Sequence, residues 1–115
     1  MVTLYGIKSC DTVRKARRWL EENGVPHRFL DFRSDGLERE RLERWAGQLG
    51  WEALLNRRSA TWRQLPAERK EGLDSARATA LMLENPTLIK RPVLESGDTC
   101  LVGFHEPQWR EALGR

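Results

Sequence analysis

The 115-residue chain has only two cysteines, Cys10 and Cys100, so a scaffold held together by several disulfide bonds is excluded. Its two histidines, His27 and His105, are far apart in the sequence, and neither has the spacing to other residues that is typical of metal ligands. We therefore expect no metal site. No apolar run approaches the roughly 18 residues of a membrane-spanning helix, so no membrane partner is expected. The chain opens directly into an apolar alternating run without a signal-peptide pattern, which favours a cytoplasmic protein.

An excess of charge of one sign is also lacking. The 20 Lys and Arg residues are nearly balanced by 17 Asp and Glu residues, giving a net charge of +3. Acids and bases alternate over residues 38–44, which is typical of a solvated helix face. No basic stripe stands clear of acidic neighbours in the sequence, so direct nucleic-acid binding is not expected. A local positive pocket for a small anionic substrate fits the charge pattern better.

The most informative stretch surrounds Cys10. An apolar alternating run over residues 2–6 predicts a short strand. Val13, Ala16 and Leu20 recur at i, i+3 and i+7, which predicts a helix directly after the cysteine. Cys10 is therefore expected where a loop enters the first turn of a helix. Unpaired backbone N–H groups and the positive end of the helix dipole favour a thiolate there, and the thiolate is the reactive form of cysteine.

The two cysteines have different surroundings. Lys8 and Arg14 add positive charge near Cys10, whereas Asp11 opposes it. These polar neighbours indicate a loop exposed to water, and we interpret Cys10 as a reactive thiol rather than a buried small hydrophobe. Cys100 lies in an apolar run that predicts a strand, and we interpret it as a core residue.

The order of the expected elements indicates a single domain over residues 1–115. A second strand over 25–32 would complete a right-handed parallel βαβ unit with the first strand and helix. The segment of about 37–85 is mostly helical in pattern and is interpreted as an insertion within this domain.

The last part of the chain returns to strand character. Residues 88–95 and 99–104 flank a three-residue turn, which predicts an antiparallel hairpin. Pro107 suits the first turn of a final helix. The sequence therefore predicts an α/β fold of the thioredoxin-like type, a mixed four-stranded sheet with a helical insertion.

Three segments of the sequence resemble the arsenate-reductase-like family, which includes the ArsC and Spx proteins. Residues 5–16, Tyr-Gly-Ile-Lys-Ser-Cys-Asp-Thr-Val-Arg-Lys-Ala, are similar to the family's opening, and most similar to its YffB-like branch. Residues 88–93 resemble its second signature, an Arg–Pro pair before a strand. Residues 54–63 resemble its central segment. The resemblance implies Cys10 as the nucleophile, Arg91 as its catalytic partner and a cis peptide bond before Pro92.

The arginine set departs from that of ArsC-type reductases, in which three arginines hold arsenate. Arg91 matches one of the three. At the second position the chain has Asn56, and the Spx-type arginine aligns better with Arg58, with Arg57 as a substitute. No arginine lies near residues 101–103, where the third is expected. This departure disfavours arsenate reduction.

The resemblance to the YffB-like branch implies a glutathione-dependent thiol reductase. Spx-type regulators carry Cys-x-x-Cys, but Val13 stands at the second position here, which excludes that intramolecular redox switch. We therefore expect Cys10 to act alone through a mixed disulfide with glutathione, the cosubstrate, and a thiol or disulfide substrate. The residues expected to bind substrate are Lys8, Arg58, Arg91 and Pro92.

Two alternatives stay open at this point. One is a glutathione-coupled arsenate reductase that uses the same Cys10. The other is an Spx-like regulator that binds a protein partner without turnover. In each case we expect a monomer, and the sequence does not identify the physiological substrate.

Overall fold

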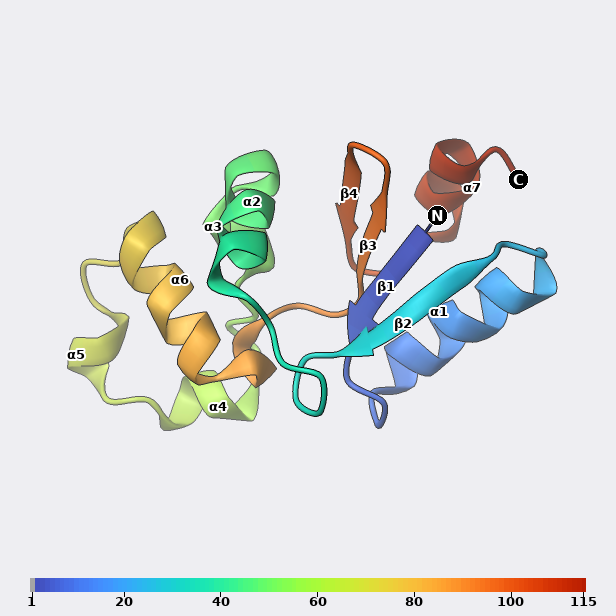
Figure 1. Cartoon of the computed structure of the whole chain (residues 1–115). Helices are drawn as coiled ribbons and strands as arrows, with labels where there is room; N and C mark the ends of the chain where they lie inside the picture. Colours follow the sequence, from blue (N-terminus) through green and yellow to red (C-terminus); the bar gives the residue numbers. More distant parts are fainter. Residues whose placement is uncertain (1) are drawn as a thin grey trace. The chain divides into compact units, whose positions relative to one another are not determined.

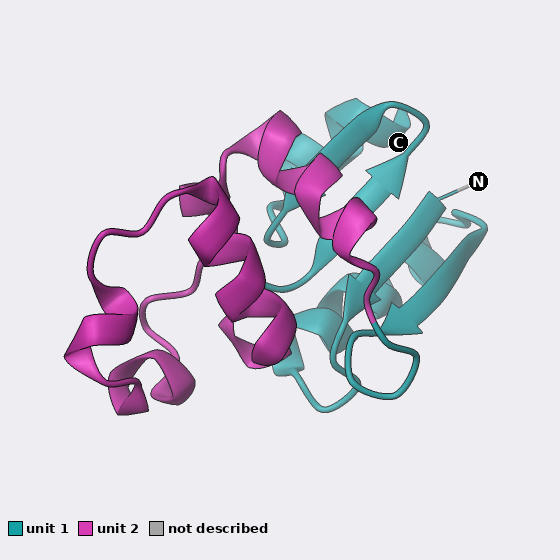
Figure 2. Ribbon diagram, turned by 60° about the vertical axis from the view of Figure 1, so that its left-hand side comes forward, with its two compact units in different colours: residues 1–36, 91–115 teal, residues 37–90 magenta. Residues whose placement is uncertain are grey.

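The computed structural model describes residues 2–115, and the chain divides into two compact units (Figure 2). Unit 1 contains the chain up to Gly36 and the segment Arg91–Arg115. Unit 2 is Leu37–Lys90. Unit 2 includes the segment of about 37–85 that the sequence indicates as mostly helical, together with the residues up to Lys90.

Unit 1 is built on a mixed four-stranded sheet in the order β2-β1-β3-β4 (Figure 1). β1 pairs with β2 in parallel, whereas β3 runs antiparallel to both β1 and β4. The strands are β1 (Val2–Gly6), β2 (His27–Asp31), β3 (Val93–Ser96) and β4 (Thr99–Val102). This sheet confirms the predicted α/β fold of the thioredoxin-like type and the predicted parallel βαβ unit.

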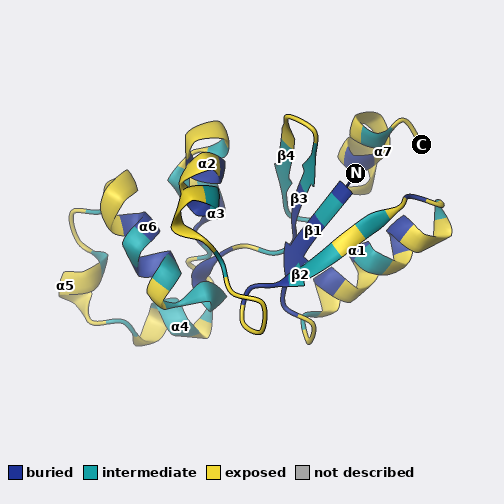
Figure 3. Ribbon diagram, in the orientation of Figure 1, coloured by how far each residue is buried: buried dark blue, intermediate teal, exposed yellow. Residues whose placement is uncertain are grey.

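Two helices of unit 1, α1 (Asp11–Glu22) and α7 (Glu106–Leu113), share one hydrophobic core with the sheet. The apolar stripe of α1 supplies buried side chains, and Figure 3 shows buried and exposed residues alternating along this helix. Trp109 of α7 is fully buried and meets Trp19 edge to face, with ring centroids 5.9 Å apart. The other buried members of this core are Val2, Leu4, Ala16, Leu20, Val25 and Leu94.

The first helix approaches the end of β1 unusually closely. A Cβ atom built on Gly6 would lie 2.6 Å from Cγ2 of Val13, which is closer than two carbon atoms can approach. Val13 is fully buried, and its β-branched side chain cannot swing aside. The glycine therefore allows the start of α1, and with it the preceding residue Cys10, to lie directly against the strand end.

Unit 2 is helical, and its buried hydrophobic residues are Leu42, Trp45, Ala46, Leu54, Leu55, Ala78, Leu81, Met82, Leu88 and Ile89. Its elements are α2 (Arg39–Leu49), α3 (Trp51–Leu54), α4 (Ala60–Gln64), α5 (Ala67–Lys70), α6 (Ser75–Glu84) and the 3₁₀ helix η1 (Pro86–Leu88). None of the helices in residues 2–115 is long and apolar enough to span a membrane.

Trp62 lies in the short helix α4, whose first turn is capped by Ser59 accepting a 3.1 Å hydrogen bond from the Trp62 N–H. One detail of the expected secondary structure is wrong. The strand expected from residue 88 begins only at Val93. The preceding residues form η1, and Ile89 then pairs with Leu55 through a single bridge.

Candidate active site

Cys10 is the N-cap residue of α1 and follows the loop that leaves β1. Its backbone is extended (φ −76°, ψ 125°), its N–H donates to the Ile7 carbonyl at 3.0 Å, and its carbonyl accepts from the Arg14 N–H at 3.0 Å. The side chain is half-buried. The structure thus has this thiol at the loop-to-helix junction that the sequence predicts.

The surroundings of Cys10 favour its thiolate. Partial burial raises the pKa of the thiol, but the N–H of Val13, the guanidinium of Arg91 and the N–H of Thr12 interact with the sulfur and together lower the pKa below its ordinary value. The Arg91 contribution comes both from a hydrogen bond and from its positive charge. No imidazole is among these groups, so helix N–H donors and one arginine lower the pKa of Cys10.

Arg91 and Pro92 immediately precede β3, and the peptide bond between them is cis. The expected cis bond is confirmed. Pro92 is buried, whereas Arg91 is half-buried. A planar guanidinium beside a thiolate can stabilise its charge, and it can also bind a carboxylate or an oxyanion through two parallel N–H bonds.

Asp31, the last residue of β2, was not recognised from the sequence as part of the site. This carboxylate is only 5 % exposed. Its Oδ2 accepts a 2.9 Å hydrogen bond from the N–H of Lys8, and its Oδ1 accepts 2.7 and 3.2 Å bonds from the N–H groups of Arg33 and Ser34. Asp31 therefore connects the end of β2 to the loop that leads into Cys10.

The protonation of Asp31 follows from these contacts. Burial raises the pKa of the carboxyl, but the three N–H donors and the charge of Lys8 outweigh it, so the pKa lies below its usual range. The sequence does contain a local signal, since Asp followed by polar residues and Gly36 is typical of a turn. The contact with Lys8, 23 residues away, has no such signal.

The loop before Cys10 is also held from the helix side. Arg14 donates from its guanidinium to the Ser9 carbonyl at 3.0 Å and forms an exposed 3.5 Å ion pair with Asp11. The side chain of Lys8 is exposed, while its backbone is fixed by Asp31. Lys8 is thus an exposed cation on a hydrogen-bonded backbone position two residues before Cys10.

Arg58 belongs to unit 2, in the turn before α4. Its N–H donates to Oδ1 of Asn56 at 3.1 Å, and its side chain is exposed. The guanidinium of Arg57 instead lies over the rings of Trp51 and Trp62, at 5.8 and 5.9 Å from their centroids. The guanidinium of Arg57 therefore contacts aromatic rings, whereas that of Arg58 is exposed.

Cys100 differs from Cys10 in burial, charge and position. It is half-buried on β4 rather than a full core residue, and it faces Glu95 across the β3–β4 ladder. Burial and the negative charge of Glu95 raise the pKa of this thiol to about 11. Glu95 pairs with Cys100 on one side and with Thr3 of β1 on the other, so Cys100 lies two strands, or about 10 Å, from Thr3. Thr3 is near the start of β1, whereas Cys10 follows the end of that strand.

No group of three His, Cys, Asp or Glu side chains in residues 2–115 is arranged to hold a metal ion. The thiol of Cys10, the guanidinium of Arg91 and backbone N–H groups make up the described site. These groups are suited to sulfur chemistry or to binding an anion.

Comparison with known proteins identifies the family to which these features belong. The model of the ArsC family matches residues 5–112, which include Cys10, Asp31 and Arg91. This chain belongs to the ArsC family. The match spans both units of the structure.

Three relatives illustrate the range of the ArsC-family proteins that this chain resembles. A solved structure of a YffB protein is 48% identical, with a TM-score of 0.92 and 97% of each chain covered. An arsenate reductase (ArsC) related protein from Brucella melitensis is 44% identical, with a TM-score of 0.77 over 99% of this chain and 95% of that one. The global transcriptional regulator Spx of Enterococcus faecalis is 33% identical over 100% of this chain and 88% of its own.

The structure of this ArsC-family protein also describes the segment where a third arginine was expected and is lacking. Leu101 and Val102 end β4, and Gly103 follows with φ +83°, its carbonyl accepting a 3.2 Å bond from Nε1 of Trp109. All three residues are half-buried. This stretch thus presents apolar side chains and a backbone anchor for α7, but no charged group.

Proposed function

We propose that this protein is a glutathione-dependent thiol reductase whose only nucleophile is Cys10. The observation that carries the proposal is the environment of Cys10, whose pKa is lowered by helix N–H groups and Arg91 while no second thiol is available to it. A nucleophile of this kind performs thiol–disulfide exchange, and it requires an external thiol to complete the cycle.

In the first step, the Cys10 thiolate attacks the glutathione sulfur of a mixed disulfide between glutathione and a substrate thiol. The substrate–glutathione S–S bond breaks, and a new S–S bond forms between Cys10 and glutathione. The substrate leaves as a thiolate and takes up a proton from water. The N–H groups of Thr12 and Val13 and the guanidinium of Arg91 favour this step because they stabilise the attacking thiolate.

In the second step, the thiolate of a second glutathione attacks the glutathione sulfur bound to Cys10. Oxidised glutathione leaves, and the Cys10 thiolate is regenerated. Over the cycle, the substrate–glutathione disulfide and one glutathione thiol are converted into the free substrate thiol and one molecule of oxidised glutathione. Cys100 does not replace the second glutathione, because its pKa of about 11 leaves almost no thiolate and β4 lies two strands from β1.

The cations near Cys10 would bind the tripeptide, which carries two carboxylates. We assign to Arg91 the dual role of stabilising the thiolate and contacting glutathione, and to Lys8 an additional contact through its exposed ammonium group. Pro92 is proposed as an apolar contact, and Arg58 of unit 2 stays a substrate-binding residue predicted from the family resemblance. Glutathione is thus a cosubstrate of a monomer that works in the reducing cytoplasm.

Intact mass spectrometry after incubation with oxidised glutathione tests this proposal directly. The expected result is a single glutathione adduct on the wild type and on Cys100→Ser, and none on Cys10→Ser. Steady-state assays would then measure reduction of a glutathione–cysteine mixed disulfide with glutathione as the reductant. Absence of an adduct on the wild type near neutral pH, or full turnover by Cys10→Ser, would overturn the proposal.

Arsenate reduction with glutathione is the second candidate, supported by the likeness to the arsenate reductase (ArsC) related protein from Brucella melitensis. The same Cys10 would attack the arsenic atom. Only Arg91 among the described arginines interacts with the Cys10 sulfur, and residues 101–103 provide no cation. An arsenate reduction assay of the wild type separates this candidate from the thiol reductase.

A regulator without turnover is the third candidate, supported by the likeness to Spx. A binding module of this kind does not need a reactive thiol, so Cys10→Ser should leave its partner complex intact. Retention of a partner by both wild type and Cys10→Ser, together with an absence of thiol turnover, would favour this candidate.

A further inference from the structure

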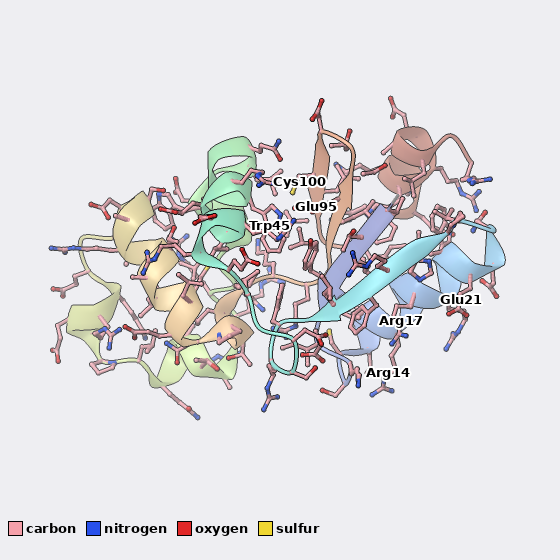
Figure 4. The ribbon with its side chains drawn as sticks, in the orientation of Figure 1. Arg14, Arg17, Glu21, Trp45, Glu95 and Cys100 are labelled. Carbon is pink, nitrogen blue, oxygen red and sulfur yellow. The ribbon has the colours of Figure 1, made fainter. Side chains whose placement is uncertain are left out.

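An open depression on the outer face of α1 begins about one helical turn after Cys10. It has a volume of about 230 Å³ and is lined by Arg14, Arg17, Arg18 and Glu21. Figure 4 shows that Arg14, Arg17 and Glu21 follow one another along the same side of this helix. Three of the four lining residues are cations, so the depression is a concentrated positive surface in a chain of nearly balanced charge.

Arg17 is more buried than the two other cations of the depression. Its guanidinium carbon lies 4.4 Å from the ring centroid of Phe29, and the residue is half-buried. Its buried Nε makes no hydrogen bond within residues 2–115. Contact with the ring face restricts the Arg17 side chain, so less side-chain freedom is lost when a carboxylate binds to its guanidinium.

Arg14 links the depression to the loop that carries the nucleophile. Its guanidinium donates to the Ser9 carbonyl, the residue directly before Cys10, and also reaches Asp11 at 3.5 Å. The depression and Cys10 therefore belong to one helix and the loop that precedes it, so the helix sets the spacing between them.

We propose that this depression binds an acidic segment of a protein substrate and presents the neighbouring mixed disulfide to Cys10. The inference rests on the proposed thiol-reductase function and names its substrate class. Preferred substrates are glutathionylated proteins with Asp or Glu close to the modified cysteine. Charge complementarity with three arginines is the basis for choosing an acidic rather than a basic or apolar partner.

The geometry of α1 sets the expected spacing. Arg14, Arg17 and Arg18 follow Cys10 by four to eight residues, which corresponds to about 6–12 Å along the helix axis. An extended peptide covers about 3.3 Å per residue, so an acidic side chain two to four residues from the modified cysteine would reach them. Glu21 lies farther along and disfavours additional acids beyond that distance.

The carboxylates of glutathione itself are the competing occupant of the same cations. If they bound here, every glutathione-containing substrate would depend equally on Arg17 and Arg18. If a protein segment binds here, only the acidic peptides depend on them. The experiment therefore has to compare substrates that share glutathione and differ in the peptide.

Three synthetic peptides, each with one glutathionylated cysteine, provide this comparison. They carry Asp, Asn or Lys three residues from the cysteine on both sides, and release of the peptide thiol is followed with glutathione as reductant. We expect kcat/KM to be about threefold to tenfold higher for the Asp peptide than for the Asn peptide at low salt, and lower still for the Lys peptide. The preference should shrink near 1 M salt, where exposed charges are screened.

The variants Arg17→Gln and Arg18→Gln should each reduce the ratio between the Asp and Asn peptides toward one. Arg18 is exposed, so its replacement tests the surface even if Arg17→Gln weakens the packing on Phe29. Lys15→Gln is the matched control, since it removes one exposed positive charge from the same helix outside the depression. This control should retain most of the preference.

Each remaining result overturns the inference in a recognisable way. Equal kcat/KM for the three peptides would remove it and leave the thiol reductase in place. An increase in KM for glutathione with every substrate in the Arg18→Gln variant would assign the cations to glutathione instead. No turnover of any mixed disulfide by the wild type would remove both the proposed function and this inference.

Discussion

The carboxylate of Asp31 accepts a 2.9 Å hydrogen bond from the N–H of Lys8, joining the end of β2 to the loop before Cys10. The same carboxylate also accepts N–H bonds from Arg33 and Ser34, so one buried side chain holds two loops. An arrangement of this kind fixes the backbone on which Cys10 and Lys8 are carried. Asp31 is therefore a positioning residue of the site, although its own side chain is hidden from substrate.

Replacing this carboxylate should weaken the whole unit. We expect Asp31→Asn to lower the free energy of unfolding by about 1–3 kcal/mol, because an amide cannot accept all three N–H bonds and leaves a buried donor without a partner. Urea denaturation followed by tryptophan fluorescence measures this difference. Glu111→Gln, an exposed acid on α7, is the control and should change stability by less than about 0.5 kcal/mol.

The loss of stability caused by Asp31→Asn should be largest near neutral pH and should decrease in acid. The folded state lowers the pKa of Asp31 relative to the unfolded chain, so the stabilisation is fully present above the unfolded pKa. It is lost as the pH falls through the folded pKa. Wild type and Asp31→Asn should therefore differ most near neutral pH and converge in strong acid. A difference that stays constant down to the acid transition would contradict the role of the charged carboxylate.

The sequence was sufficient for those features that depend on local pattern. The stripe of Val13, Ala16 and Leu20 predicted α1, and the helix start then identified where Cys10 would lie. The parallel βαβ unit followed because a helix of this length between two strands has one common arrangement. These are short-range signals, and the structure agrees with them to within about two residues.

Features that depend on distant contacts were missed. Asp31 had no visible role in the sequence, because its partner Lys8 is 23 residues away. The positive depression of α1 was missed because Asp11 and Glu21 flank the basic run of residues 14–18, so the local charge looked balanced in the sequence. The helix brings Arg14, Arg17 and Arg18, spaced three and four residues apart, onto one face, which a linear count of charges does not show.

The two cysteines should be modified at very different pH values. Because the pKa of Cys10 is lowered, we expect iodoacetamide to alkylate it readily at pH 7. The pKa of about 11 leaves Cys100 with a thiolate fraction of only about 10⁻⁴ at that pH. Mass spectrometry of tryptic peptides over time, in the wild type and in Cys10→Ser, measures both rates. Equal labelling of the two thiols at pH 7 would contradict this assignment.

Arg91 should contribute directly to the reactivity of Cys10. Its replacement by Gln removes both a hydrogen bond and a positive charge from the thiolate, so the pKa of Cys10 should rise. Loss of one such bond to a charged group, about 1.5 kcal/mol, would slow alkylation at pH 6 by about tenfold. The rate at pH 10 should differ much less, because the thiol is then ionised in both proteins. An unchanged pH profile would show that the helix N–H groups alone activate the thiol.

The close approach of Gly6 and Val13 predicts that a larger residue at position 6 destabilises the protein and that a smaller residue at position 13 restores part of the stability. A methyl group on Gly6 would meet Cγ2 of Val13 at 2.6 Å, so Gly6→Ala must displace the first turn of α1. We expect a loss of about 1–3 kcal/mol in the free energy of unfolding, together with slower alkylation of Cys10. Val13→Ala alone should also destabilise the protein, because it removes buried methyl groups from a fully buried position.

The double variant Gly6→Ala/Val13→Ala separates a steric clash from a general loss of packing. If the clash is the cause, its cost disappears when the Val13 methyl groups are absent, and the double variant is more stable than the sum of the two losses predicts. A double-mutant cycle by urea denaturation measures this coupling, and the alkylation rate of Cys10 should recover in parallel. Simple additivity of the two changes would show that Gly6 is not required for the approach of α1, and the position of Cys10 would then need another explanation.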